Sequence, residues 1–372
     1  MHKKAFSLKR GAQLTDSNLL LIIAICIFVI LYVLAIVLFG GSFRRFQGFF
    51  DLFNNNATLL ILACGLSIVM VGGGIDISVG GVVALVTAAC AVYLDAGVGN
   101  VWVSLCIALG IGLAFGLVQG FLIAYLEVQP FIISLAGMFF ARGMATVITR
   151  YSHTVALESF IELKNVKLVI GFLGYAARNG NWIPATIDLS VLVALFVVAA
   201  VAVMLKWSRF GRNLYAVGGN SQSALMLGIN VKRVKFFSYL ICGLLAGIAG
   251  FTFLLKAGSG YAQHAMTFEM KAIAASIIGG TLLTGGVGNV LGSPVGIMAL
   301  MTIEYIVRVS GVTNDGREYL QDITTGAMLF LALVLQSVVL ARRGTRGGSD
   351  GGAGSSGGGF KLAIPQWLKF KA

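Results

Sequence analysis

The chain has 372 residues, of which 58% are hydrophobic and only 11% are charged. A soluble domain carries about 25% charged residues, so this composition excludes a soluble globular protein and indicates a polytopic membrane protein. The net charge of +13 fits basic residues beside membrane spans and contact with anionic lipid, and no nucleic-acid-binding motif accompanies it.

The amino-terminal segment, residues 1–18, is polar and contains Lys3, Lys4, Lys9 and Arg10. An uncharged apolar run follows over 19–39, which supplies the roughly 20 residues that a transmembrane helix needs. This run is longer than the apolar part of a signal peptide, so we expect a retained first span. The basic residues before it predict a cytoplasmic amino terminus.

Further apolar segments predict an all-α polytopic membrane domain over 19–341, with about ten transmembrane helices. The later spans are predicted over 57–72, 78–94, 101–126, 131–149, 187–206, 236–256, 268–284, 287–310 and 321–341.

Counting crossings from a cytoplasmic amino terminus places two basic segments, 206–235 and the 342–372 tail, in the cytoplasm. The tail is rich in Gly and Ser, which is typical of a flexible linker. Arg44 and Arg45 would then lie outside, and an interfacial helix over 43–53 is the only explanation that the sequence offers. The longest segment expected outside the membrane lies between the fifth and sixth predicted spans.

Residues 150–186 form this external segment and carry charges of both signs. A segment of this length can form a small lid or a docking surface for an external protein. A solvated connector explains it equally well.

A glycine-dense stretch, VGGGIDISVGG, interrupts the apolar pattern at 71–81. Irregular backbone at membrane depth is tolerated where it is buried in protein or faces a watery cavity, although glycines also permit close helix packing. Asp76 is an acid within the membrane, which makes it a functional candidate. We favour a structural role, in which Asp76 caps the helix that begins near Ser78, over direct contact with a substrate hydroxyl. The candidate residues of this break are Gly73, Gly74, Asp76, Ser78 and Gly80.

The 206–235 loop contains six Lys or Arg residues and no acid. Asn220 is a suitable N-cap for a short helix, and Gly228 fits the left-handed position after its end. Such a short helix needs a partner for stability, and its outward apolar residues, Ala224, Leu225 and Met226, can contact a cytoplasmic protein. The alternative is an ordinary basic loop with a turn.

A second glycine-dense break, GGTLLTGGVGNVLG, covers 279–292. Glu269 precedes it at the start of a predicted span, where an acid suits a helix amino terminus. An ion pair between Glu269 and Lys256 or Lys271 is the favoured interpretation, whereas Glu304 has no partner that the sequence can identify. The candidate residues of this region are Glu269, Gly279, Gly280, Gly285 and Gly286.

No motif for catalysis is present. The sequence lacks a Walker ATP-binding loop, a zinc-protease motif and a nucleophile elbow. The five cysteines lie within apolar runs without a CxxC pair, and the histidines form no cluster, so no metal site is expected. The chain by itself is not expected to be an enzyme.

Four segments occur in a fixed order: GGGIDISVGG, QPFIISLAGMFFARGMATVIT, FGRNLYAVGGNSQSALMLGINVKRVK and FEMKAIAASIIGGTLLTGGVGNVLG. In their order and spacing they resemble the membrane permeases of bacterial ABC sugar importers, in the branch with the ribose, xylose, galactose and galactofuranose systems. The resemblance covers residues 15–340. The chain departs from the pattern at Ser223, Lys271 and Gln119, where such permeases often have Ala, Asp and Asn.

The resemblance implies an inner-membrane permease of ten spans that moves a monosaccharide by alternating access. It implies three kinds of partner: a second permease, identical or different, two cytoplasmic ATPase subunits and a periplasmic sugar-binding protein. ATP and Mg would bind the ATPase subunits, and no cofactor is expected in this chain. A coupling helix maps onto Gly219–Gly228. The residues expected to couple to the ATPase are Gly211, Arg212, Gly219, Asn220, Ala224, Leu225, Met226 and Gly228.

Two other functions remain open from the residues alone. A secondary transporter with inverted repeats would be driven by H⁺ or Na⁺ through Asp76, Glu269 or Glu304. A membrane anchor or receptor would carry no solute at all.

Overall fold

The computed structural model describes residues 16–40, 43–95, 99–176 and 181–309, together with a few positions between 323 and 334. Most of the amino-terminal segment 1–18, most of the span predicted over 321–341, and the 342–372 tail lie outside the described residues.

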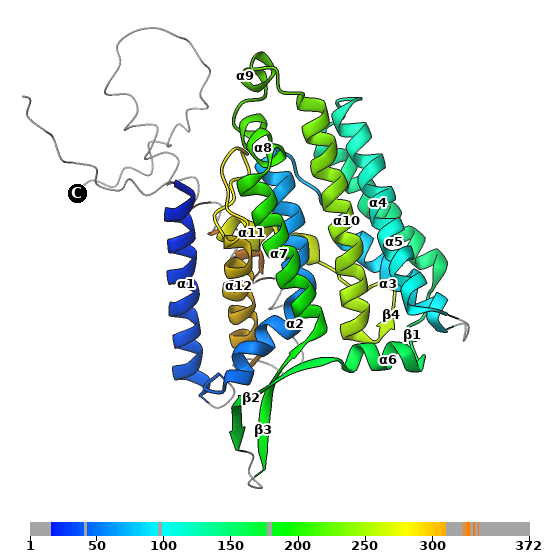
Figure 1. Cartoon of the computed structure of the whole chain (residues 1–372), viewed down its shortest axis with the longest axis vertical. Coiled ribbons are helices and arrows are strands. Elements are labelled where there is room, and N and C mark those ends of the chain that lie inside the picture. Colours follow the sequence, from blue (N-terminus) through cyan, green and yellow to red (C-terminus); the bar gives the residue numbers. More distant parts are fainter. Residues whose placement is uncertain are drawn as a thin grey trace, which may run out of the picture. The chain divides into compact units, whose positions relative to one another are not determined.

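Helices make up most of the described chain (Figure 1). They are α1 (Asp16–Phe39), α2 (Phe46–Val71), α3 (Val79–Asp95), α4 (Val101–Ala124), α5 (Pro130–Ile148), α6 (Glu158–Asn165), α7 (Leu189–Trp207), α8 (Arg209–Gly219), α9 (Ser221–Met226), α10 (Val231–Ala257), α11 (Phe268–Ile278) and α12 (Gly292–Val309). The strands are β1 (His153–Thr154), β2 (Lys167–Ala176), β3 (Trp182–Asp188) and β4 (Ser259–Gly260).

Six helices of the described part are long and apolar enough to cross a membrane, namely α1, α2, α4, α5, α7 and α10. α3 and α12 are shorter apolar helices. α11 has 11 residues, about 16 Å at 1.5 Å per residue, so it is too short for the full span predicted over 268–284. The chain is therefore embedded in the membrane through several spans, and the total of about ten remains a prediction.

The interfacial helix predicted over 43–53 corresponds to the first segment of α2, although its interfacial position stays a prediction. α2 begins at Phe46 and continues through a kink at Asn56, whose backbone dihedral angles (φ −124°, ψ 15°) are not helical. The guanidinium of Arg45 lies 4.0 Å from the centre of the Tyr175 ring. This cation–π contact gives Arg45 a partner on strand β2.

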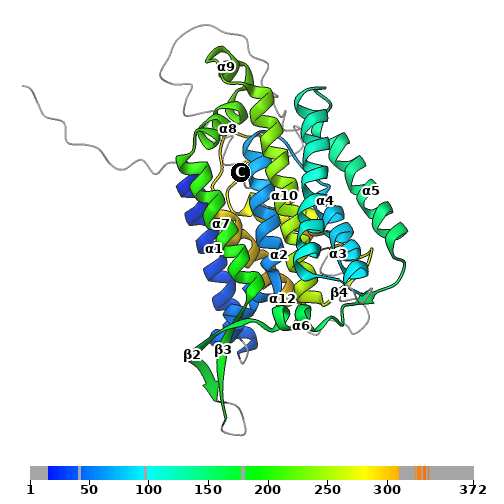
Figure 2. The ribbon, with the colours of Figure 1, turned by 45° about the vertical axis from the view of Figure 1, so that its right-hand side comes forward.

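α10 packs against α2, α3 and α4, and Figure 2 shows it between α2 and α4. The α4–α10 contact depends on glycines four residues apart, as at Gly112 and Gly116 of α4. A Cβ on Gly116 would lie 2.8 Å from the Tyr239 carbonyl oxygen. Small residues at this spacing let two helices approach closely within a membrane.

The two ends of the bundle carry different elements: α8 and α9 lie at one end and the β2–β3 hairpin at the other (Figure 1). The hairpin is antiparallel, and Lys167 pairs with Asp188. Asn54 of α2 fixes it to the bundle, because its amide donates to Thr186 O at 3.0 Å and accepts from Asp188 N at 3.0 Å. The all-α prediction missed this hairpin, which occupies the segment predicted to be external.

Candidate functional site

Both predicted glycine breaks are present. α2 ends at Val71 and α3 begins at Val79, while α11 ends at Ile278 and α12 begins at Gly292. Several glycines in the breaks have left-handed backbone conformations that other residues adopt only with strain. These are Gly73 (φ 79°), Gly280 (φ 93°), Gly285 (φ 85°) and Gly286 (φ 73°).

The two breaks meet each other and the end of α8. The Gly286 N–H donates to the Val71 carbonyl oxygen at 2.9 Å. A Cβ on Gly285 would lie 2.8 Å from both Gly73 Cα and Gly218 O, and a Cβ on Gly218 would overlap Val71 O. We call Gly73, Gly218, Gly285 and Gly286 the glycine junction. Its backbones touch directly, so it leaves no room for a side chain.

α8 is anchored to the same region by two side chains. Leu214 is fully buried and packs near Gly72. The Tyr215 hydroxyl donates to Gly288 O at 2.9 Å. Burial raises the pKa of the Tyr215 phenol, so the hydroxyl remains a donor at neutral pH.

The short helix predicted in the basic loop is α9, and its predicted ends are confirmed. The Ser223 N–H donates to Asn220 Oδ1 at 2.9 Å, which makes Asn220 the N-cap. After the helix, Gly228 has a φ of 79°, and its N–H donates to Leu225 O at 2.9 Å. This left-handed glycine ends the helix as expected.

The outward face of α9 differs from the prediction at one residue. Ala224 is buried, with 1% of its surface exposed, so it faces the protein and not a partner. Leu225, Met226 and Leu227 are 63%, 88% and 78% exposed. We call these three residues the α9 patch. A large apolar group exposed on a short helix is typical of a protein contact surface.

The other residues predicted for coupling fall into two groups. Gly211 is buried, its N–H donates to Ser208 Oγ at 3.0 Å, and a Cβ there would clash with Leu205. Gly211 therefore shapes the corner between α7 and α8 and is not available to a partner. Arg212 and Gly219 are exposed.

Asp76 lies in the first break and is buried, with 3% exposed. Its Oδ1 accepts from Ser78 N at 2.9 Å and from Ser78 Oγ at 2.6 Å. Gln119 of α4 donates through Nε2 to Ser78 Oγ at 2.8 Å. Asp76 thus binds the residue immediately before α3, as a structural role requires, and substrate contact stays a prediction.

Glu269 does not pair with a lysine, so that interpretation is wrong. Its Oε2 faces the guanidinium of Arg142, 3.8 Å from Nη2. Arg142 in turn donates to Ala265 O at 3.0 Å. Glu269 also lies against α3, because a Cβ on Gly80 would overlap its Oε2. Arg142 was not among the predicted site residues, although a single charge within the apolar span 131–149 was its signal.

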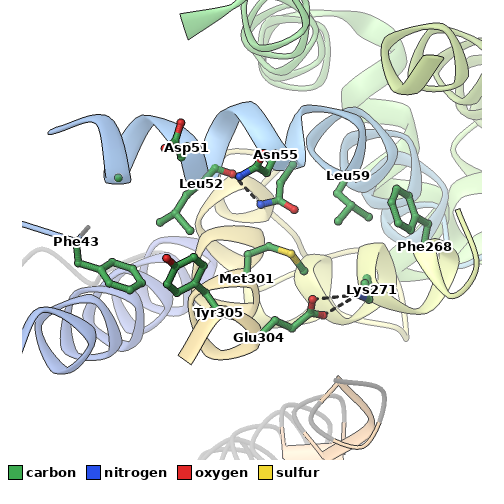
Figure 3. Close-up of a pocket in the computed structure, with 12 residues that line it drawn as sticks. Phe43, Asp51, Leu52, Asn55, Leu59, Phe268, Lys271, Met301, Glu304 and Tyr305 are labelled. Atoms are coloured by element: carbon green, nitrogen blue, oxygen red, sulfur yellow. Dashed lines mark hydrogen bonds and ion pairs between the residues drawn. The ribbon is translucent and has the colours of Figure 1, made fainter. Parts of the chain in front are cut away.

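Each lysine considered for Glu269 has another partner. Lys271 Nζ lies 2.9 Å from Glu304 Oε1 and 3.0 Å from Oε2, so Glu304 has the partner that the sequence could not identify (Figure 3). Lys256 binds Asp188 at 3.1 Å, beside the hairpin. Both pairs depend on contacts between distant segments. Among the described residues, no cluster of three or more His, Cys, Asp or Glu side chains could hold a metal ion.

Comparisons with known proteins agree on a class. A family model described as "Branched-chain amino acid transport system / permease component" matches residues 48–333. The chain is 34% identical to the fructose import permease protein FruG of Bifidobacterium longum (strain NCC 2705), over 91% of this chain and 96% of that protein.

Two relatives from Escherichia coli (strain K12) match over similar lengths. Identity is 32% to the ribose import permease protein RbsC, over 80% of this chain and 87% of that protein. Identity is 30% to the xylose transport system permease protein XylH, over 83% of this chain and 91% of that protein. No solved structure matches the chain.

Proposed function

The chain belongs to the family of branched-chain amino acid transport system permease components, and on this basis we propose that it is the transmembrane subunit of an ABC importer for a monosaccharide. It is a transport component and not an enzyme. The sugar class is supported by the fructose, ribose and xylose in the names of its relatives.

The observation that carries this proposal is the position of the α9 patch. The patch lies on a capped helix of six residues, and α8 connects this helix to the glycine junction. A partner that binds the patch can therefore act on both helix breaks at once. An ordinary basic loop would need neither the exposed apolar residues nor the close backbone contacts.

The proposed topology places α9 in the cytoplasm of a bacterial inner membrane protein. The six basic residues of 206–235, without any acid, favour the cytoplasmic side. Both termini would lie on that side too, since basic residues also flank the first predicted span and follow the last. The hairpin end then faces outward, and about ten spans complete the domain.

Three partners follow from this assignment. A cytoplasmic ATPase would bind the α9 patch and supply the energy from ATP and Mg, for which this chain has no motif. A binding protein outside the membrane would deliver the sugar. A second permease, identical or different, would complete the translocation path.

The glycine junction suggests how movement of α9 reaches the membrane. Backbone-to-backbone packing has no flexible side chain that could absorb a displacement of α8. Left-handed glycines on each side provide positions where the chain direction can change. ATP binding and hydrolysis on the partner would thus shift α9 and reorient the helices that end at the two breaks.

The experiment is uptake of D-fructose, D-ribose and D-xylose into proteoliposomes that contain the permease and the ATPase and binding protein that co-purify with it. We expect uptake to require ATP on the α9 side and to persist after ionophores collapse the H⁺ and Na⁺ gradients. Uptake that follows an ion gradient without ATP would instead support the secondary transporter. An absence of flux under every condition would support the anchor or receptor.

A further inference from the structure

A cavity of about 470 Å³ lies between α2, α11 and α12. Its volume falls within the range of about 300–1,000 Å³ that small-molecule sites occupy. The part of α2 that lines it, from Gly48 to Leu59, spans the kink at Asn56 and precedes the glycine junction along the helix. The cavity is therefore on the hairpin side of the junction, away from α9.

The wall has aromatic rings at its two ends. Phe43 and Tyr305 lie together at one end of the cavity, and Phe268 lies at the other (Figure 3). Phe43 and Tyr305 meet edge to face, with ring centres 4.8 Å apart, which holds both rings in place. A sugar ring presents a face of C–H groups that can pack on such rings.

The rest of the wall is polar, and only some of its hydrogen-bonding groups have partners within the protein. Within the described part of the chain, the Tyr305 hydroxyl and the Asn55 amide make no hydrogen bond, and Asp51 accepts bonds through Oδ1 alone. The Lys271 ammonium has three donors, and the two oxygens of Glu304 use two of them. The cavity thus offers donors and acceptors in the mixture that sugar hydroxyls require.

The charges of the wall favour one kind of solute. Among the described residues that line the cavity, Asp51 and Glu304 are acids and Lys271 is the only base, so these residues together carry one net negative charge. Glu304 and Lys271 are shielded from solvent, with 6% and 12% of their side chains exposed. In such surroundings charges interact strongly, so an anionic solute is disfavoured.

We propose that this cavity is an outward-facing binding site for a neutral polyhydroxylated molecule of monosaccharide size. Lys271, Asp51, Asn55 and Tyr305 bind its hydroxyls, and the paired rings of Phe43 and Tyr305 pack against its apolar face. The site deepens the proposed function and rests on it, because it places the transported solute before the glycine junction.

The test uses a cysteine inside the cavity as a reporter. Asn55→Cys is made in full-length permease in lipid nanodiscs, with Cys26→Ser and Cys106→Ser because these two cysteines are exposed. Ser152→Cys, at an exposed position outside the cavity, is the matched control. The rate of N-ethylmaleimide labelling is measured with D-fructose, D-ribose, D-xylose or D-galactose, and with D-gluconate and L-leucine.

We expect at least one neutral sugar to slow the labelling of Asn55→Cys about threefold, which is the effect of a ligand present at about twice its Kd. The same sugar should leave the labelling rate of Ser152→Cys unchanged. D-gluconate and L-leucine should not protect. Adding Glu304→Gln removes one carboxylate and frees Lys271, so D-gluconate should then protect. Because Asn55→Cys alters the site itself, thermal unfolding of the unmodified permease is measured with the same panel, and the protecting sugar should raise its midpoint.

Two results would overturn the proposal. One is that no neutral sugar protects Asn55→Cys or raises the midpoint of the unmodified protein. The other is that D-gluconate or L-leucine protects as well as the sugars do before Glu304 is changed. ATP-driven sugar uptake without protection would reject this cavity and leave the importer function standing, whereas protection without ATP-driven uptake would reject the importer and keep the site.

Discussion

The carbonyl oxygen of Val71 accepts a hydrogen bond of 2.9 Å from the backbone N–H of Gly286. Val71 ends α2, and Gly286 lies between α11 and α12, so this bond joins the two helix breaks. Gly218 of α8 fits against both ends of the bond. The 206–235 loop and the two breaks therefore form one mechanical unit.

The glycine junction predicts that two adjacent glycines differ in their tolerance of an added methyl group. In Gly218→Ala the Cβ would overlap Val71 O and lie 2.6 Å from Gly286 N, whereas in Gly219→Ala it meets no atom within 4 Å. We expect Gly218→Ala to lower the free energy of unfolding by about 1–3 kcal/mol through overpacking and to reduce uptake. Gly219→Ala should be neutral in both. Thermal unfolding of the purified protein and proteoliposome uptake measure the two effects, and equal behaviour of the variants would contradict a tightly packed junction.

Asp76 predicts a difference between two substitutions. Asp76→Ala removes the acceptor for Ser78 N and Oγ, and leaving a buried donor unpaired costs about 1–3 kcal/mol. Asp76→Asn keeps an oxygen at that position, so we expect it to retain most of the stability and uptake. Thermal unfolding of the purified protein and proteoliposome uptake measure both variants. If Asn is as damaging as Ala, the negative charge is required and the capping role is insufficient.

Local signals explain why the short helix α9 and the break before α3 could be predicted from the sequence. Asn220 and Gly228 determine the two ends of α9, and Asp76 and Ser78 determine the start of α3. Each of these residues lies within a few positions of the helix end that it determines. Glycine clusters inside apolar runs likewise indicate helix breaks directly. In each case the physical cause and its effect are close together along the chain.

Pairing across the bundle could not be predicted in the same way. Glu269 faces Arg142 and Lys271 faces Glu304 because of the rotation and crossing of helices that are far apart in sequence. The inward position of Ala224 had no signal either, since a helix of six residues is too short for a reliable apolar period. The hairpin did have a signal, an Asn-Gly pair at 179–180 between two apolar runs.

The buried ion pair between Lys271 and Glu304 predicts a large loss of stability when one partner is removed. Glu304→Gln leaves the Lys271 charge without a counter-ion, which we expect to cost about 3–5 kcal/mol. Adding Lys271→Met removes the unpaired charge and should recover most of that loss. The control is Glu127→Gln in the exposed Lys232–Glu127 pair, 3.1 Å apart with 52% and 73% exposed, where we expect about 0–1 kcal/mol.

Chemical unfolding of the four purified proteins in the same detergent gives these values. A loss for Glu304→Gln no greater than that for Glu127→Gln would show that the buried pair contributes no more than a surface pair. Failure of Lys271→Met to recover stability would mean that a cause other than the unpaired charge, such as an altered contact with Thr325, produces the effect.

Accessibility from outside the cell tests the proposed topology. In a protein with Cys26→Ser and Cys106→Ser, Ser152→Cys should react with an impermeant thiol reagent in intact cells, because it precedes β1 at the hairpin end (Figure 1). Ser223→Cys on α9 should react only after the cells are opened. Labelling of Ser223→Cys in intact cells would invert the topology and remove the proposed contact with a cytoplasmic ATPase.

The α9 patch predicts that one added charge prevents the permease from binding its proposed ATPase partner. Leu225→Glu places a carboxylate within the patch, where an unpaired charge at a buried interface typically costs several kcal/mol. Ser223→Glu adds the same charge to the same helix, but at the third helical position, where a glutamate stabilises the helix start. Both residues are exposed, so both variants should reach the membrane in normal amounts. We expect Leu225→Glu to lose the co-purifying ATPase and ATP-driven sugar uptake together, and Ser223→Glu to keep most of each. If Leu225→Glu retained both, the patch would not be the docking surface, and the loop would serve only as a basic connector between α7 and α10.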